Sequence, residues 1–452
     1  MIRLGRPTGR VAIAVAAAIA IPFARSARAN GAFPDELSIH LPASAPHRIL
    51  LGTNFGLVIS DDDGGTWRYA CEPYVTTGSS ANLSSANVSY YQVTADGAVL
   101  ADSVNLTRSS DVGCSWPNSG GSVVGAVVSD IFADPTDPNF ALAIIATVGG
   151  TNLVASHDGG KTFGDPLYST VDLLTGIESS RSTPGVVYAT AIHATGSTTS
   201  DPVLLRSIDY GVHWSAPTRI PAPNGTQPSI LAVDPADANT VYLRLLSGTS
   251  DSIGITTDGQ NVKTSLTVSG SLTSFLRASD GTLYAGQLSG NLYVRPVGAT
   301  TFSKEAAPHL RCLGQRPGTT RIYACGDAFL DNFSVGTSDD GGKTFQPLMK
   351  FAQILGPLTC ASVQTACGAH WQRIQQVLGI ATAPDAGLSV DAGTPPPAKG
   401  GSHCASVGGD AWALLTLLAF SLRNRRGPSS IPMRAREALT LLAFSLRSRS
   451  RS

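Results

Sequence analysis

This chain has few charged residues and no excess of either sign of charge. Only 14% of its 452 residues are charged, and 32 basic residues balance 32 acidic ones. No basic stripe appears before the C-terminus, so the positive surface that nucleic-acid binding requires is missing. The sequence also lacks a Gly-x-Ser-x-Gly elbow, the turn that carries the nucleophile of many serine hydrolases. We therefore exclude nucleic acid as a partner and find no motif for serine hydrolysis.

Motifs for metals and cofactors are missing as well. The stretch Cys367-Gly368-Ala369-His370 lacks the further ligands of a zinc site, and a disulfide explains its cysteine better. The stretch Asp61 to Gly64 resembles the start of a calcium loop, but the closing glutamate of such a loop is absent. We expect neither a metal nor a cofactor.

Small and turn-forming residues are abundant instead. The chain holds 47 Gly and 28 Pro, a composition that fits many short strands joined by turns better than helical bundles. Its apolar runs are short and nearly continuous, as at 140–147, which is typical of sheets covered on both faces. The composition favours an all-β fold.

One eight-residue motif recurs along most of the chain. Its first copy, Ser60 to Trp67, reads Ser-x-Asp-x-Gly-x-Thr-Trp and has the chemistry of a tight turn between two strands. Good copies begin at Ser109, Ser156, Ser207 and Ser338, and degraded copies lie at 256–259 and 301–302. The residues assigned to structural turns are Ser60, Asp62, Gly64, Thr66, Trp67, Asp111, Trp116, Asp158, Phe163, Asp209, Trp214, Asp340 and Phe345.

The spacing of this motif predicts the architecture. Its aspartate position recurs about every 40 to 50 residues, which is the length of one four-stranded propeller blade. Strands and an Asp-Pro turn precede the motif, most clearly at 129–156 and 230–243. Seven such units predict a single seven-bladed β-propeller over residues 30–352.

The motif resembles the Asp-box, or bacterial neuraminidase repeat, over about residues 36–350. Sialidases, xyloglucan-cleaving endoglucanases, sortilin-type receptor domains and photosystem assembly factors share it. The resemblance implies that the box joins the third and fourth strands of a blade at its periphery and is structural. Its aspartates are then not catalytic, and a ligand is expected on the central axis, at the blade ends away from the boxes.

Two kinds of glycosidase can be tested against this resemblance. The only Arg-Ile-Pro, at Arg219, follows the fourth box, whereas sialidases place theirs near the first strand. Xyloglucanase-like catalysis needs two carboxylates about 5 to 10 Å apart. The carboxyls left outside motif and Asp-Pro turns show no spacing that singles out a pair: Glu72, Glu178, Glu305, Asp96, Asp102, Asp130, Asp172, Asp280 and Asp327. The catalytic residues, if any, stay unknown.

The first 29 residues have the pattern of an export signal. Arg3, Arg6 and Arg10 precede an apolar run over 11–24, and Ala27-Arg28-Ala29 forms a small-x-small cleavage site. A membrane anchor is the alternative, but the run is short for a span and contains Pro22. We expect signal peptide 1–29 to be removed.

Export indicates that the cysteines form disulfides. Cys312 and Cys325 flank a turn and suit a cross-strand bridge, Cys360 and Cys367 enclose a small loop, and Cys71 and Cys114 form a plausible third pair. The seventh cysteine, Cys404, has no partner.

The C-terminal part divides into four expected segments. They are a disulfide-containing cap at 353–382, a Pro/Gly/Ala linker at 383–403, a tail at 404–426 and a basic tail at 427–452 that repeats 415–423 as 439–447. A cysteine, a short apolar run and a group of basic residues after it resemble the myxobacterial C-terminal sorting tail. This resemblance implies that Cys404 is kept for anchoring. A membrane helix is the alternative, but the apolar run is shorter than a span.

These observations favour an exported, cell-surface-anchored propeller that binds an extracellular protein or polysaccharide and is not an evident enzyme. We expect a monomer on the bacterial outer surface, attached through the tail. The alternative is a secreted glycoside hydrolase with an unrecognised carboxylate pair.

Overall fold

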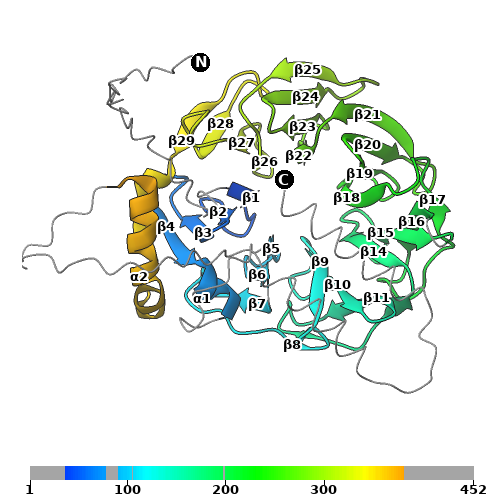
Figure 1. Ribbon diagram of the computed structural model, residues 1–452, viewed down its shortest axis with the longest axis horizontal. Coiled ribbons are helices and arrows are strands. Elements are labelled where there is room, and N and C mark those ends of the chain that lie inside the picture. The colour runs from blue at the N-terminus through cyan, green and yellow to red at the C-terminus, as the bar shows by residue number, and fades with distance from the viewer. Residues whose placement is uncertain (1–35, 78–89, 104, 197–198, 381–452) are drawn as a thin grey trace, which may run out of the picture. The chain divides into compact units, whose positions relative to one another are not determined.

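The computed structural model describes residues 36–77, 90–103, 105–196 and 199–380. Of the eight sheets in the described residues, seven stand around a central axis, one for each sequence unit (Figure 1). The predicted all-β fold with a seven-bladed propeller is confirmed. The expected signal peptide, linker, Cys404 and both tail segments lie outside the described residues.

The first strand of each blade lies next to the axis, and the later strands follow outward (Figure 1). Blades 1 to 3 contain β1 (Glu36–His40), β2 (Ile49–Thr53), β3 (Gly56–Ser60) and β4 (Trp67–Cys71); β5 (Tyr90–Val93), β6 (Val99–Asp102) and β7 (Leu106–Ser109); and β9 (Val127–Ala133), β10 (Ala141–Thr147), β11 (Gly150–Ser156) and β13 (Tyr168–Thr170). Between blades 2 and 3, β8 (Gly120–Gly121) pairs with β12 (Thr162–Phe163).

The other blades each have four strands in antiparallel order. Blades 4 and 5 contain β14 (Leu173–Ser179), β15 (Val187–Ala194), β16 (Ser200–Ser207) and β17 (Thr218–Arg219), then β18 (Gln227–Val233), β19 (Val241–Ser247), β20 (Ser250–Thr256) and β21 (Lys263–Ser269). Blades 6 and 7 contain β22 (Leu272–Arg277), β23 (Leu283–Gln287), β24 (Asn291–Arg295) and β25 (Ser303–Ala306), then β26 (Cys312–Gln315), β27 (Ile322–Cys325), β28 (Val335–Ser338) and β29 (Gln346–Met349).

The middle strands of the blades form the core. In β10, five consecutive residues from Ala141 to Ile145 are buried, so both faces of the strand are covered. Leu142 and Ile144 belong to one apolar cluster with Leu174 and Val187 of the next blade. Near-continuous apolar runs occur here because a blade has a neighbour on each face.

The cap after blade 7 returns to the beginning of the ring. Following η1 (Phe351–Gln353), β30 (Ile354–Pro357) pairs in parallel with β4 and adds a fifth strand to blade 1. Helix α2 (Ala361–Leu378) ends at Gly379, whose φ of 66° is the left-handed conformation that glycine adopts readily. The helix packs against β30, β4 and the short α1 (Glu72–Thr77).

Two disulfides fix this cap, and they correct two expected pairings. Cys71 at the end of β4 bonds Cys367 in α2, and Cys114 in the turn after β7 bonds Cys360 at the start of α2. The expected pairs Cys360–Cys367 and Cys71–Cys114 are therefore wrong. A small loop favoured Cys360–Cys367, and Cys71–Cys114 was the pair that then remained. The cap instead brings together cysteines that are 296 and 246 positions apart in the sequence. The expected bridge Cys312–Cys325 is present across β26 and β27.

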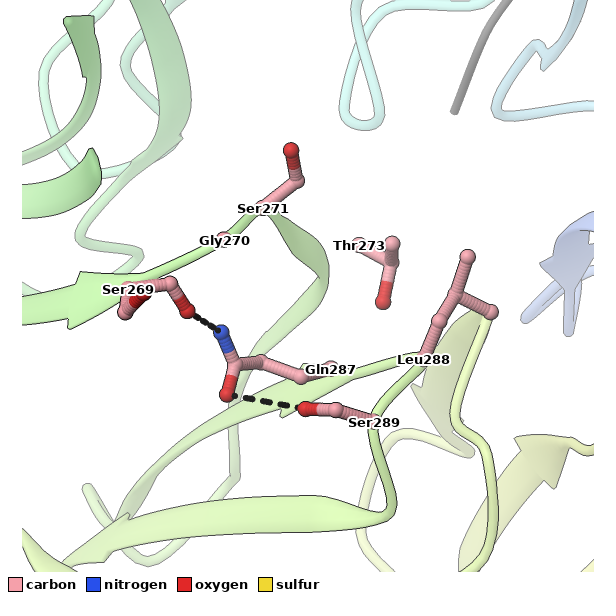
Figure 2. Close-up of a pocket in the computed structure, with 7 residues that line it drawn as sticks. All are labelled: Ser269, Gly270, Ser271, Thr273, Gln287, Leu288 and Ser289. Atoms are coloured by element: carbon pink, nitrogen blue, oxygen red, sulfur yellow. Dashed lines mark hydrogen bonds between the residues drawn. The ribbon is translucent and has the colours of Figure 1, made fainter. Parts of the chain in front are cut away.

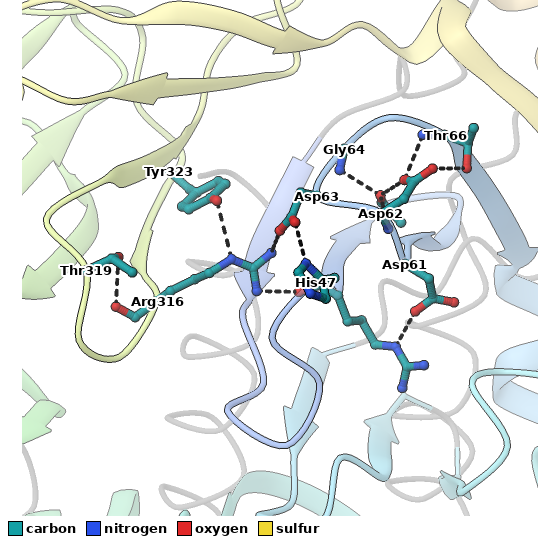
Figure 3. A network of polar contacts seen from close by, with 11 residues as sticks. His47, Asp61, Asp62, Asp63, Gly64, Thr66, Arg316, Thr319 and Tyr323 are labelled. Atoms are coloured by element: carbon teal, nitrogen blue, oxygen red, sulfur yellow. Dashed lines mark hydrogen bonds and ion pairs between the residues drawn. The ribbon is translucent and has the colours of Figure 1, made fainter.

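Polar contacts also join blade 7 to blade 1 (Figure 3). The Arg316 side chain is 10% exposed, and its guanidinium donates to Asp63 Oδ1 at 2.9 Å and to the Arg48 carbonyl at 3.0 Å. Its Nε lies 3.3 Å from the Tyr323 hydroxyl. Asp63 also contacts His47 at 2.6 Å. We call the junction formed by these contacts, β30, α2 and the two long-range disulfides the closing seam.

Candidate functional site

The motif turns have the same local geometry in good copies. In the turn from β11 to β12, Asp158 Oδ1 accepts from the backbone N–H groups of Lys161 and Thr162 and from the Ser156 hydroxyl. Asp158 Oδ2 accepts from the Thr162 hydroxyl at 2.6 Å. Partial burial raises the pKa of Asp158, but these hydrogen bonds outweigh it and hold the pKa at about 2.

Substituted copies preserve the role of the aspartate. Ser115 donates its hydroxyl to Asp111, and the ring of His213 lies 2.6 Å from Asp209 in the place where other copies have threonine. In the degraded copy of blade 5, Asn261 donates both its backbone and its side-chain N–H to Asp258. The motif aspartates in good copies, Asp62, Asp111, Asp158, Asp209 and Asp340, all accept hydrogen bonds within their own turn.

The motif aromatics complete the turns. The indoles of Trp67, Trp116 and Trp214 each donate to a glycine carbonyl three residues earlier in their own motif. Phe163 is buried among residues of blades 2 and 3. These side chains are committed to the turn and to the core, so a binding site has to be sought elsewhere.

A cavity of about 340 Å³ lies at the axis. It is bordered by β1, β5, β9, β14 and β18 or the loops after them, and by Pro317 after β26. Because strands in a blade alternate in direction, connections after the first and third strands lie at the same end. The cavity is therefore on the axis, as expected, but at the blade ends that carry the motif turns, whereas we expected the opposite ends.

Glu178 on β14 is the carboxyl that lines this cavity. Its Oε1 accepts from the Val233 backbone N–H at 2.9 Å, and the side chain is half-buried. Burial raises the pKa of Glu178 to about 7; the Val233 N–H opposes this rise, Asp130 adds to it and Arg181 opposes it. A carboxyl with this pKa exists in both protonation states near neutral pH and can therefore donate or accept a hydrogen bond.

Two other carboxyls near Glu178 hold neighbouring inner strands together. Asp130 on β9 accepts from its neighbour Ile131 through Oδ1 and from Ile177 on β14 through Oδ2, each at 3.0 Å. Asp134 accepts from the Ser179 hydroxyl at 2.5 Å. Both oxygens of Asp130 are thus engaged by backbone N–H groups, which suits a structural link better than a nucleophile or base.

The remaining carboxyls that the sequence left open are not among the residues that line the cavity. Asp172 lies 2.8 Å from His193, Asp280 accepts from Thr282, and Asp327 lies 3.7 Å from Arg311. Arg219 of the Arg-Ile-Pro stretch is on the outermost strand β17 and pairs with Asp201 at 3.0 Å. Asp96 accepts from Thr94, Asp102 and Glu72 are buried, and Glu305 is exposed on β25.

Sequence reasoning missed the hydroxyls that connect inner strands. Thr175 lies at an irregularity of β14 and donates to the Pro228 carbonyl of the next blade at 2.6 Å. Thr273, at the equivalent irregularity of β22, donates to the Leu310 carbonyl. Threonine at matching positions of two units was the available signal.

Within the described ranges, no group of three or more His, Cys, Asp or Glu side chains is arranged to hold a metal ion. In the same ranges, no helix is both long enough and apolar enough to cross a membrane.

Comparison with known proteins identifies the fold only. No protein-family model and no curated protein matches the sequence. A GH74 enzyme from Niastella koreensis is similar in structure, with a TM-score of 0.50 and 12% identity, over 71% of this chain and 55% of that one. This chain therefore spans about half of that enzyme's length.

Two further solved structures have lower scores. YCF48 from Cyanidioschyzon merolae matches with a TM-score of 0.44 and 12% identity, over 64% of this chain and 92% of that one. PorZ, a surface component of the type-IX secretion system of Porphyromonas gingivalis, matches with a TM-score of 0.47 and 10% identity, over 70% of this chain and 38% of that one.

Proposed function

We propose that this chain is an exported, surface-anchored propeller that binds a protein or a glycan at the axial cavity. The observation that carries the proposal is the cavity itself, to which six blades contribute. Glu178, Arg181 and Gln92 are polar side chains in its lining, and they come from separate strands or loops. Loops held by a rigid scaffold around one cavity are a common arrangement for ligand binding.

Export and anchoring are supported by independent features. Three disulfides are present, and such bonds persist mainly outside the cytoplasm. The signal pattern at 1–29 and the tail with Cys404 are consistent with surface display, and we propose that the protein acts as a monomer. Cell fractionation of a Cys404→Ser variant tests the anchor: the variant should be released into the medium, and full retention on the surface would refute this part.

We also propose that the motif turns are Asp-boxes. The shared Ser, Asp and Thr hydrogen bonds and the position between the third and fourth strands of the blade support this assignment. In this proposal the Asp-boxes stabilise the blades, and the residues around the axial cavity bind the ligand.

A charge reversal at the cavity tests the binding role. Arg181 is exposed at the cavity, whereas Lys304 is exposed on the outer strand β25, so Arg181→Glu and Lys304→Glu form a matched pair. Binding of the full chain to purified surface polysaccharides and to a peptide library is measured for each. We expect at least tenfold weaker binding with Arg181→Glu and less than a twofold change with Lys304→Glu. Equal binding by all three proteins, or binding to neither class of probe, would refute the proposal.

The alternative is glycoside hydrolysis, and one observation favours it. The pKa of about 7 at Glu178 suits a general acid at neutral pH. A second carboxylate is needed as nucleophile or base, and the nearby Asp130 already accepts two backbone hydrogen bonds. Turnover of a labelled polysaccharide that disappears in Glu178→Gln would establish the hydrolase and displace the binding-only role.

A further inference from the structure

A second cavity lies where the outermost strand of blade 5 connects to the first strand of blade 6 (Figure 2). Its volume is about 280 Å³. It is formed by the connection from β21 to β22 and by the turn from β23 to β24. These connections follow the fourth and second strands of their blades, so they lie at the opposite end of the ring from the motif turns. The lining side chains are all uncharged: Ser269, Ser271, Thr273, Gln287, Leu288 and Ser289.

Gln287 is the fixed polar group of this cavity. It is only 2% exposed, and its Oε1 accepts from Ser289 at 3.3 Å, from Asn291 at 3.1 Å and from Tyr293 at 3.3 Å. Three donors on one oxygen determine which end of the carboxamide is nitrogen. The side chain therefore has one orientation before any ligand arrives.

The side-chain nitrogen of Gln287 has one N–H group without an acceptor among the described residues. Nε2 donates to the Ser269 carbonyl at 3.0 Å, and no other described residue accepts from it, although an amide nitrogen carries two N–H groups. Gly270, with φ of 79°, follows Ser269, and a Cβ at this glycine would lie 3.9 Å from Nε2. A glycine here keeps side-chain atoms away from that nitrogen.

Three serines and one threonine line the same cavity as this donor. Ser271 is exposed and makes no hydrogen bond through its side chain to any described residue, and Figure 2 shows it projecting from the connection. Ser289 donates to Gln287 and accepts from the Asn291 side chain at 2.7 Å, so one lone pair of its oxygen remains for another donor. Leu288 supplies one half-buried apolar side chain beside them. The cavity thus presents paired donors and acceptors, one apolar contact and no charge.

We propose that this cavity binds a neutral saccharide. Each sugar hydroxyl both donates and accepts, as serine hydroxyls and a carboxamide require, and the CH groups of a pyranose fit an apolar side chain. An ionic ligand would lose water without gaining an opposite charge. The inference rests on the proposed binding role and adds a ligand class at the other end of the ring.

Binding of the full chain to defined oligosaccharides tests this site. The probes are cellohexaose, mannohexaose and the acidic hexamer of galacturonic acid, measured by titration calorimetry. Ser271→Tyr fills the cavity from an exposed position, and Thr301→Tyr is the matched control in an exposed turn of the same blade as β24. Ser271→Ala removes only the hydroxyl.

We expect one neutral hexamer to bind, with at least tenfold loss in Ser271→Tyr, a three- to tenfold loss in Ser271→Ala and less than twofold change in Thr301→Tyr. The inference would be overturned if Ser271→Tyr bound a neutral hexamer as tightly as wild type does. It would also be overturned if the acidic hexamer bound more tightly than the neutral ones, or if neither neutral hexamer bound. The two sites are tested separately by carrying Ser271→Tyr in both Arg181→Glu and its reference protein: binding that remains then belongs to the axial cavity, whereas neutral-hexamer binding that is lost in Ser271→Tyr and kept in Arg181→Glu belongs to this cavity.

Discussion

The closing seam and the arc of blades 3 to 6 are joined by different means. Within the arc, successive blades are connected by the chain itself, and their contacts are apolar packing and polar bridges such as Arg277 to Asp234 at 2.9 Å. At the seam, blade 7 meets blade 1 without direct chain connection, so bringing them together carries a loop-closure cost. The two long-range disulfides, β30 and Arg316 all occur there.

This difference explains where the covalent bonds are placed. The strands β1 to β4 of blade 1 and β26 to β29 of blade 7 are each consecutive in the chain, so neither blade takes one of its four strands from the other. The C-terminal cap replaces such an exchange by adding β30 to blade 1 and bonding α2 to blades 1 and 2. The arc needs no equivalent because chain continuity already limits the separation of its blades.

Removal of a seam disulfide should have the largest effect. Cys71→Ser with Cys367→Ser should lower the free energy of unfolding by about 4 kcal/mol, because this bridge closes a loop of about 50 residues in the unfolded chain even while Cys114–Cys360 is intact. A loop of about 15 residues is worth about 3 kcal/mol. Urea unfolding measures the difference. The control is Cys312→Ser with Cys325→Ser, a bridge inside one blade with a sequence separation of 13. A control loss equal to or larger than the seam loss would contradict this account.

Arg316 should matter more than an exposed arginine of the same blade. Arg316→Ala removes bonds to Asp63, the Arg48 carbonyl and Tyr323 from a nearly buried site, and should cost about 2 to 3 kcal/mol. Arg321 pairs with Asp339 on the surface, and Arg321→Ala should cost under about 1 kcal/mol. Thermal unfolding of both variants measures the two losses of stability. Equal losses would show that Arg316 stabilises the protein no more than an exposed arginine does.

Glu72 makes the seam sensitive to pH. It is 5% exposed, no described residue bonds its Oε1, and burial raises its pKa from 4.5 to about 8. Between these values the unfolded chain releases the proton while the folded chain keeps it, so stability falls as pH rises from about 5 to 8. Glu72→Gln should remove this loss and raise the free energy of unfolding by up to about 4 kcal/mol at pH 8, because each unit of pKa shift is worth about 1.4 kcal/mol.

The measurement is urea unfolding of wild type and Glu72→Gln at pH 5 and pH 8. The two proteins should be close in stability at pH 5 and differ at pH 8. Parallel losses between the two pH values would show that Glu72 is not the titrating group.

Substitution of a motif aspartate should change the free energy of unfolding least. The size of this change should be similar for turns at the closing seam and in the arc of blades 3 to 6. Asp158→Ala removes the acceptor for Ser156, Lys161 and Thr162 and should cost about 1 kcal/mol at pH 7. Because the folded pKa is about 2, this contribution is present above pH 4 and should disappear as pH falls towards 2. Asp165→Ala, an exposed change just after the same turn, is the control in thermal unfolding. Equal thermal stability of Asp158→Ala and wild type would refute the role of the turn.

Local chemistry made much of the fold predictable. The repeat of Ser, Asp, Gly, Thr and an aromatic at blade spacing indicated seven blades, because each turn is completed within eight residues. In the degraded copy, Asp258 also accepts a side-chain hydrogen bond within its own turn, from Asn261, one residue before the position of the motif threonine. The bridge Cys312–Cys325 was predictable for the same reason, since a turn joins its two strands.

Long-range contacts were beyond such reasoning. The partners of Cys71 and Cys114 lie 296 and 246 residues away, and loop size alone favoured nearer cysteines. Glu178 had no distinguishing neighbours in sequence, because its raised pKa comes from burial and from Asp130 on another blade. Gln287 likewise acquires its role from a turn and from the preceding blade.

The sequence by itself determined the blades and their turns, since both depend on residues close together in the chain. Only the tertiary structure decided how the ring closes, which cysteines pair and where the cavities lie. Those features depend on distances between separate blades, and no local pattern encodes them.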